Sequence, residues 1–215
     1  MLFVYAVTFS YAYISLDTGT GALILFGSVQ LTIVLFSLIS GNRLRLVEWV
    51  GIITAFAGFV YLVLPSLSTP SFRGFILMTI SGVAWGTYTL RGKISQNPLD
   101  DTAFNFLRTF PFVLALLIIE LNHVNFSFHQ GIIFALISGA ITSGIGYSVW
   151  YMAVVGLSSI QAGVVQLLVP IIAAIGGVIF AQEFISLRLI FSSILVLGGI
   201  MLITSSQYHE VKSQE

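Results

Sequence analysis

The amino-acid sequence predicts an all-α integral membrane protein with eight transmembrane helices, arranged as inverted repeats of three helices plus five. Two observations carry this prediction. The 215 residues are 57% hydrophobic and only 7% charged, whereas soluble domains usually carry about 25% charged residues. In addition, residues 12–62 align without a gap with residues 153–203, at a constant shift of 141 residues. Such an internal repeat predicts two structurally related halves.

Eight apolar stretches approach the length of about 20 helical residues that a hydrocarbon core of about 30 Å requires. Short connections rich in polar and turn-forming residues separate them, and no connection is long enough for a soluble domain. A membrane β-barrel is a poor alternative, because its strands alternate apolar and polar residues and the run 112–119 does not. The expected spans are residues 1–16, 19–40, 48–65, 74–95, 102–122, 131–151, 157–181 and 184–205.

The placement of Lys and Arg predicts the orientation, because these residues are enriched near cytoplasmic helix ends. If Met1 is cytoplasmic, six basic residues lie inside and only Arg73 and Arg188 lie outside. We therefore expect a multi-pass protein of the cell inner membrane with both termini cytoplasmic. In this topology the two copies of the repeat run in opposite directions. The six inside residues are Arg43, Arg45, Arg91, Lys93, Arg108 and Lys212.

The repeat divides the chain into three parts. Residues 1–65 are expected to form a partial first repeat of three helices, and residues 74–205 a second repeat of five helices. Residues 206–215 are expected to form a polar cytoplasmic tail. A first copy as long as the second would need two further helices before Met1.

Pro170 lies near the middle of the seventh expected span. Proline has no backbone N–H, so the carbonyl four residues earlier, that of Gln166, should lose its partner. A free backbone acceptor and a polar side chain would then coincide at mid-membrane, where interrupted helices often form binding sites. A simple kink, with Gln166 bonded to a neighbouring helix, is an equally good interpretation.

Gln30 lies at a similar depth in the second expected span. The repeat shift carries it to Ile171, which is next to Pro170. We therefore expect Gln30 and Gln166 to face one cavity from opposite halves. The alternative is that Gln30 makes an interhelical hydrogen bond without touching a ligand.

Aromatic side chains are the other candidates for cavity lining, because their rings combine apolar area with a hydrogen-bond donor. Trp85, Tyr88 and Tyr147 are assigned this role, and Trp85 in particular lies at mid-span. Trp150 and Tyr151 lie near a helix end, where Trp and Tyr collect at the membrane surface. We therefore expect these two residues to belong to the interfacial belt.

Small residues recur at four-residue spacing in two helices. Gly82 and Gly86 form one such pair, and Ala135, Gly139 and Ser143 form a longer series. Small residues at this spacing let helix backbones approach closely in membranes. We interpret both sets as packing surfaces.

Catalytic residues, metal ligands and cofactors are not expected. The chain has no cysteine, and its histidines, His123, His129 and His209, lie in connections or in the tail. Ser143 and Ser148 have no His or Asp in their helix, although an intramembrane enzyme would need such a partner. The expected partners are a small-molecule substrate and the lipid bilayer, without nucleic acid. A homodimer is left open.

Three segments together resemble a known family. Residues 156–203 combine a small-residue turn, a helix with a central Pro, a Gln182–Glu183 hinge and a Gly-rich final helix. Residues 81–86 read Ser-Gly-Val-Ala-Trp-Gly, and residues 143–151 read Ser-Gly-Ile-Gly-Tyr-Ser-Val-Trp-Tyr. This pattern resembles the EamA domain of the drug/metabolite transporter superfamily, in which the hinge is often Gly-Glu and ten helices form two inverted repeats.

The resemblance implies that the chain matches the third to tenth helices of such a protein. It also implies a transporter that moves small organic metabolites, such as amino acids or drugs, across the inner membrane by alternating access. It does not imply an enzyme. The alternative left open is a truncated, non-transporting membrane remnant, or a subunit of a larger assembly.

Overall fold

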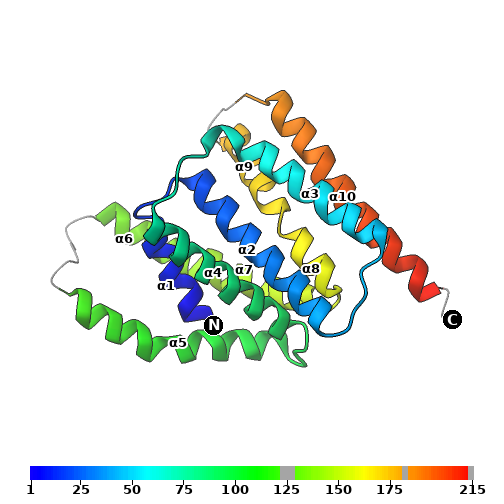
Figure 1. Cartoon of the computed structure of the whole chain (residues 1–215). Helices are drawn as coiled ribbons and strands as arrows, with labels where there is room; N and C mark the ends of the chain where they lie inside the picture. Colours follow the sequence, from blue (N-terminus) through cyan, green and yellow to red (C-terminus); the bar gives the residue numbers. More distant parts are fainter. Residues whose placement is uncertain (122–128, 181–183, 213–215) are drawn as a thin grey trace.

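The computed structural model describes residues 1–121, 129–180 and 184–212, with side chains except at 129, 130 and 208–212. These residues form a helical bundle without any β-strand (Figure 1). The hinge residues Gln182 and Glu183 lie outside the described part. The elements are α1 (Leu2–Ala12), α2 (Thr18–Ile39), α3 (Leu46–Val63), the 3-10 turn η1 (Leu64–Ser66), α4 (Phe72–Gly92), α5 (Pro98–Glu120), α6 (His129–Leu136), the π-helix η2 (Ile137–Ser143), α7 (Gly144–Val154), α8 (Ser159–Val165), α9 (Leu168–Phe180) and α10 (Leu187–Lys212).

Within the described residues, six helical stretches are long and apolar enough to cross a membrane. They correspond to six of the eight expected spans, and they make the protein a multi-pass membrane protein. At most a third of the most apolar window of each stretch is buried inside the bundle, so lipid covers most of the remainder. The stretches are residues 18–39, 46–66, 98–120, 131–155, 159–180 and 187–207.

The other two expected spans differ from simple lipid-facing helices. Helix α1 has only 11 residues, shorter than a span of about 20 residues. Helix α4 carries Arg73 and Arg91 near its ends and a row of Gly, Ser and Thr between them, so it is less apolar. Helix α4 lies between α1 and α2. Because protein rather than lipid covers much of its surface, it tolerates these small and polar residues.

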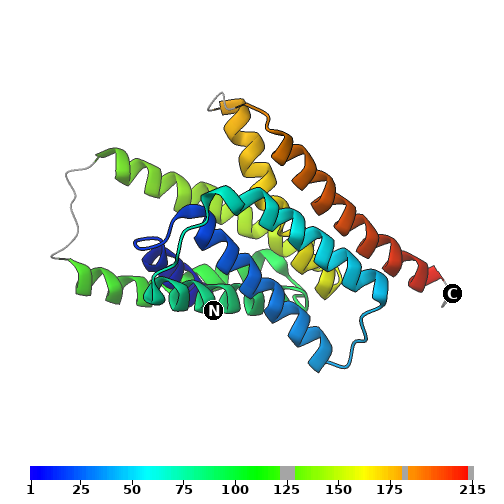
Figure 2. The same cartoon turned by 45° about the horizontal axis from the view of Figure 1, so that its top comes forward.

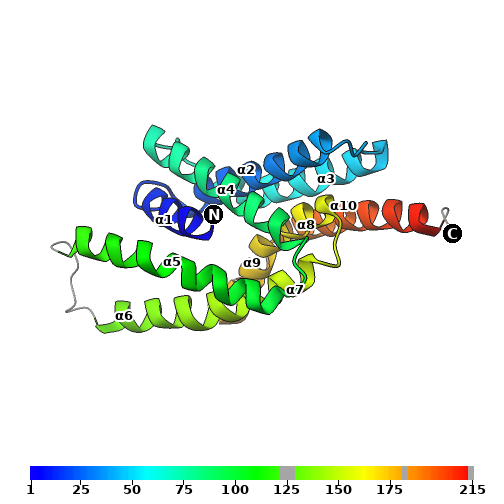
Figure 3. The same cartoon turned by 90° about the horizontal axis from the view of Figure 1, so that it is seen from below.

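Glycines on α4 allow this close fit, as the four-residue spacing predicted. A Cβ on Gly82 would lie 2.5 Å from the Cβ of Ser28 on α2, and one on Gly86 would lie 3.0 Å from the Cβ of Thr32. The second predicted surface behaves differently. A Cβ on Gly139 would have no described atom within 4 Å. The prediction of a packing surface within this chain is therefore wrong for Gly139, because η2 lies at the edge of the bundle (Figure 3).

Helices α3 and α10 lie side by side along their length (Figures 1 and 2) and form the most extensive helix pair in the described chain. Their backbones are in close contact at Gly51 and Gly199. A Cβ on Gly199 of α10 would lie 2.5 Å from the carbonyl oxygen of Gly51 and 2.7 Å from the backbone nitrogen of Ala55. No side chain other than hydrogen fits at this position.

A second contact between the same helices mirrors the first. A Cβ on Gly58 of α3 would lie 3.1 Å from the carbonyl oxygen of Ser192 and 3.1 Å from the backbone nitrogen of Val196. The 141-residue shift carries residues 51 and 55 onto 192 and 196, and it carries residue 58 onto 199. The two contacts are therefore equivalent when the helices are exchanged, and the helices run antiparallel.

Two expected spans are interrupted, and the last helix extends beyond its expected span. The sixth span consists of α6, η2 and α7, and the seventh is broken between α8 and α9. Helix α10 continues to Lys212. The described part of the polar tail expected from residue 206 is therefore helical.

Replacing Gly199 with alanine should destabilise the bundle by roughly 1–3 kcal/mol, the usual cost of forcing an extra group into a packed contact. The helices would have to separate, because the new methyl group would overlap the Gly51 carbonyl oxygen. Gly198→Ala is the matched control, since no described atom lies within 4 Å of its Cβ position and both changes raise helix propensity equally. Thermal unfolding in detergent measures the difference. Equal melting temperatures for the two variants would contradict the packing argument.

Candidate functional site

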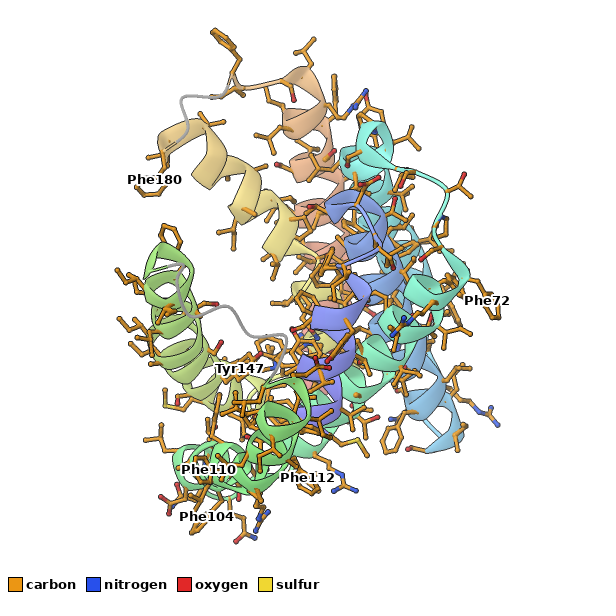
Figure 4. All side chains as sticks on the ribbon, turned by 90° about the vertical axis from the view of Figure 1, so that its left-hand side faces the viewer. Phe72, Phe104, Phe110, Phe112, Tyr147 and Phe180 are labelled. Carbon is orange, nitrogen blue, oxygen red and sulfur yellow. The ribbon has the colours of Figure 1, made fainter. Side chains whose placement is uncertain are left out.

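A cavity of about 440 Å³ lies between the α1, α2 and α4 side of the bundle and the η2, α7, α8 and α9 side. It therefore takes residues from both expected repeats. In Figure 4 the labelled Tyr147 lies near the centre of the molecule, whereas Phe72, Phe104 and Phe180 lie at its periphery. The lining residues are Tyr5, Leu25, Phe26, Trp85, Thr142, Ser143, Gly146, Tyr147, Trp150, Val165, Gln166, Leu168, Val169 and Ile172.

The break between α8 and α9 places Gln166 on the cavity wall. Helix α8 ends at Val165 and α9 begins at Leu168. The Gln166 carbonyl accepts a hydrogen bond from the Val169 N–H at 3.1 Å. The prediction of a free carbonyl at Gln166 is therefore wrong, because a tighter turn ahead of Pro170 brings a donor from three residues later.

The side chain of Gln166 is bonded at both ends. Its Nε2 donates to the carbonyl oxygen of Ala162 at 2.7 Å, and its Oε1 accepts a hydrogen bond from the indole Nε1–H of Trp85. Gln166 is buried, and a buried amide is costly unless its polar atoms are paired. Trp85 on α4 and Gln166 thus hold each other in place in the cavity wall.

Aromatic rings surround Trp85. Its ring lies 4.8 Å from that of Tyr5 and 5.2 Å from that of Tyr147, measured between centroids. It also stacks on Tyr88 at 5.5 Å. Tyr88 itself lies behind this wall and is not among the lining residues. Its backbone carbonyl accepts a hydrogen bond from the Tyr151 hydroxyl at 3.3 Å.

Trp150 and Tyr151 do not lie in an interfacial belt. Tyr151 is only 3% exposed, and its ring lies 4.6 Å from that of Tyr88. Trp150 lines the cavity. The belt prediction is wrong because α4 and α5 cover this end of α7, so its rings face protein instead of lipid headgroups.

Besides Tyr88, two other predicted site residues, Gln30 and Pro170, lie outside the cavity lining. Gln30 instead borders an apolar groove between α2 and α3, and a Cβ on Gly163 would lie 3.1 Å from its Oε1. Among the described residues neither polar atom of its buried side chain has a hydrogen-bond partner. Pro170 is partly buried beside the lining residue Val169. The expectation that Gln30 and Gln166 face one cavity is therefore wrong.

Sequence reasoning missed Tyr5 and Leu25, both of which line the cavity. The repeat contained a signal for them. The 141-residue shift carries Leu25 onto Gln166, and extended upstream it carries Tyr5 onto Gly146. Both members of each pair border the cavity. Searching for the repeat partner of the candidate Gln166 would have found Leu25, whereas Tyr5 pairs with Gly146, which was not a candidate residue.

The chemistry of the lining is uncharged. No Asp, Glu, Lys, Arg or His occurs among the described residues that line the cavity. Their side chains are aromatic rings, aliphatic groups, hydroxyls and one amide. An ion moved here from water would find no opposite charge among them, and an unpaired charge is costly in such surroundings. The wall suits a molecule with an apolar body and a few hydrogen-bonding groups.

Membrane-length helices around an internal cavity define a multi-pass membrane protein. Residues 72–205 match the model of a family described as the EamA-like transporter family. The chain belongs to this family, and with it to the drug/metabolite transporter superfamily. The family is one of transporters and points away from enzymatic activity.

Relatives of the chain cover most of its length. An uncharacterized protein of Pseudomonas aeruginosa is 46% identical over 202 residues, which are 94% of this chain and 70% of the relative. An uncharacterized transporter of Archaeoglobus fulgidus is 28% identical over 94% of this chain and 74% of the relative. A second one from that organism is 26% identical over 93% of this chain and 72% of the relative.

A solved structure described only as "Crystal structure of protein" has a similar fold. It has a TM-score of 0.79 and 19% sequence identity, covering 94% of this chain and 72% of that chain. At this identity the likeness concerns the fold alone, because one fold hosts many functions.

Trp85→Phe should lower stability by roughly 1–3 kcal/mol, because it leaves the buried Gln166 Oε1 without its donor. Trp150→Phe is the control, since the buried Trp150 Nε1 has no hydrogen-bond partner among the described residues. Both changes remove the same ring volume, but Trp150→Phe leaves no acceptor unpaired, so it should lose less stability than Trp85→Phe. Thermal unfolding of both variants in detergent gives the comparison. A Trp150→Phe variant that loses as much stability as Trp85→Phe would contradict this assignment of the hydrogen bond.

Proposed function

We propose that this protein moves small organic metabolites, such as amino acids or drugs, across the inner membrane by alternating access. The central cavity carries the proposal. It is formed by residues from both repeats, and such central sites are where transporters of repeated design bind solutes. Membership of a transporter family supports the same function.

We further propose that the halves are inverted repeats. The equivalent glycine contacts of α3 and α10 support this arrangement, because exchanging the helices reproduces both contacts. With both termini cytoplasmic, equivalent helices would run in opposite directions. Alternating access would then consist of one half rocking against the other around the cavity.

The proposed substrate contacts are Trp85, Tyr147 and Gln166, which line the cavity. Tyr88 would act from behind by holding the ring of Trp85, with which it stacks. Pro170 would preserve the helix break that presents Gln166, because a proline cannot donate to restore the regular helix. Gln30 is proposed to act on the helix contact near Gly163 instead of on the substrate.

The non-transporting remnant or subunit is the weaker alternative. The two Archaeoglobus fulgidus relatives are both described as transporters, and each aligns with more than nine tenths of this chain. The proposed partners are therefore a small-molecule substrate and the bilayer, without nucleic acid. A homodimer is compatible with this proposal.

Uptake and efflux of a broad panel of labelled amino acids and other metabolites, in cells with and without the gene, tests the function. For a transported compound, Gln166→Ala and Tyr147→Ala should each reduce flux by roughly tenfold, equivalent to about 1.4 kcal/mol of lost interaction. Met201→Ala is the control, because Met201 on α10 is 70% exposed. Unchanged fluxes across the whole panel would count against the proposal. Equal losses in all three variants would count against the site.

The topology can be tested separately, because the chain has no cysteine of its own. Asn42 lies in the α2–α3 loop and Thr69 lies between η1 and α4, and both are exposed. Each is replaced with cysteine in its own variant. With both termini inside, a membrane-impermeant maleimide added to intact cells should label the Thr69→Cys variant and spare the Asn42→Cys variant. Both variants should react after the cells are opened. The reverse pattern in intact cells would overturn the orientation without affecting the cavity.

A further inference from the structure

A second cavity, of about 460 Å³, lies at one end of the bundle and differs in chemistry from the central one. The α2–α3 loop, the end of α4, the start of α8 and the end of α10 meet there. Most of its described lining is polar or charged, and Leu44 and Ile160 are the exceptions. The lining residues are Ser37, Asn42, Arg43, Leu44, Glu48, Lys93, Ser158, Ser159, Ile160 and Gln207.

Two cations line this cavity without an acidic partner. Lys93 is half-buried, and its Nζ donates to the Ser159 hydroxyl oxygen at 3.3 Å. Among the residues whose side chains the structure describes, no carboxylate forms an ion pair with Lys93 or with the exposed Arg43. A charge that is partly removed from water is costly unless an opposite charge or strong hydrogen bonds compensate it.

Glu48, the acidic residue of the lining, is bonded elsewhere. It is 6% exposed. One of its oxygens accepts from the Gln207 Nε2 at 2.7 Å, and the other accepts from the Arg45 backbone N–H at 2.8 Å. These bonds tie the carboxylate to α10 and to the start of its own helix, α3. The lining therefore presents two positive charges against one negative charge whose two oxygens are already hydrogen-bonded.

Hydroxyl and amide groups complete the arrangement. Because the Ser159 oxygen accepts from Lys93, its hydroxyl hydrogen is available to donate. One Asn42 amide hydrogen bonds the Ser37 hydroxyl at 3.3 Å, and the second is available. Two cations with converging neutral donors form the set that recognises an oxyanion.

We propose that this cavity binds a phosphate group between Lys93 and Arg43, with Ser159 and Asn42 donating hydrogen bonds to it. The group belongs either to an anionic phospholipid at the membrane surface or to a soluble phosphate compound. The chemistry of the site is the same in both cases. The proposal is independent of the central cavity and of the solute that the protein carries.

The full-length protein in nanodiscs tests the site in two arms. In nanodiscs of phosphatidylcholine alone, inorganic phosphate is titrated while thermal unfolding and heat of binding are recorded. In the second arm, phosphatidylglycerol replaces part of the lipid. A ligand that binds only the folded state raises the melting temperature. A shift with phosphate assigns a soluble ligand, and a shift with phosphatidylglycerol alone assigns a lipid headgroup.

The double variant Arg43→Gln, Lys93→Met should weaken the observed binding about ten- to a hundredfold, as expected for lost hydrogen bonds from charged groups. Arg73→Gln is the control, because Arg73 lies at the opposite end of α4 and should bind as the unaltered protein does. Binding in neither arm, or equal binding by the double variant, overturns the proposal. If the double variant fails to fold, the unaltered protein decides, because its binding must weaken as NaCl rises.

Discussion

Close contact between helix backbones is the constraint on which this bundle depends. Lipid tails are as apolar as leucine, so burying apolar side chains gives helices little reason to associate in a membrane. Association must come from close van der Waals contact and from interhelical hydrogen bonds. Gly51, Gly58 and Gly199 supply that contact between α3 and α10, and Gly82 supplies it between α4 and α2. Larger residues at these points would separate the helices and remove the contact.

Lipid also makes each polar group in the interior of the bundle depend on a hydrogen-bond partner within the protein. Trp85 and Gln166 pair with each other across α4 and the α8–α9 break, so a direct hydrogen bond between side chains holds the cavity wall. Gln30 has no such partner among the described residues. An unpaired amide in this environment costs free energy, and Gln30 lies at the contact of α2 with Gly163 of α8.

The two cavities differ in the charge of the residues that line them. The central cavity has neutral walls of rings and hydroxyls, whereas the end cavity holds Arg43 and Lys93 beside hydroxyl and amide groups. Helix α8 connects them, because Ser159 at its start borders the end cavity and Val165 at its end borders the central one. A ligand in either place would therefore contact the same short helix.

Composition and pattern alone determined the membrane environment, the helical class and most helix positions, because a lipid solvent demands long apolar helices. The family followed from the resemblance of three segments to the EamA domain. Composition and pattern also identified Trp85, Tyr147 and Gln166, whose polarity is unusual at that depth. The sequence did not reveal that Gln30 and Gln166 lie in different places, that Tyr151 is buried, or that the Gln166 carbonyl is bonded. Those outcomes depend on which face of each helix meets which neighbour and on the turn ahead of Pro170. Such choices are made by contacts between residues far apart in the chain, and local pattern carries no record of them.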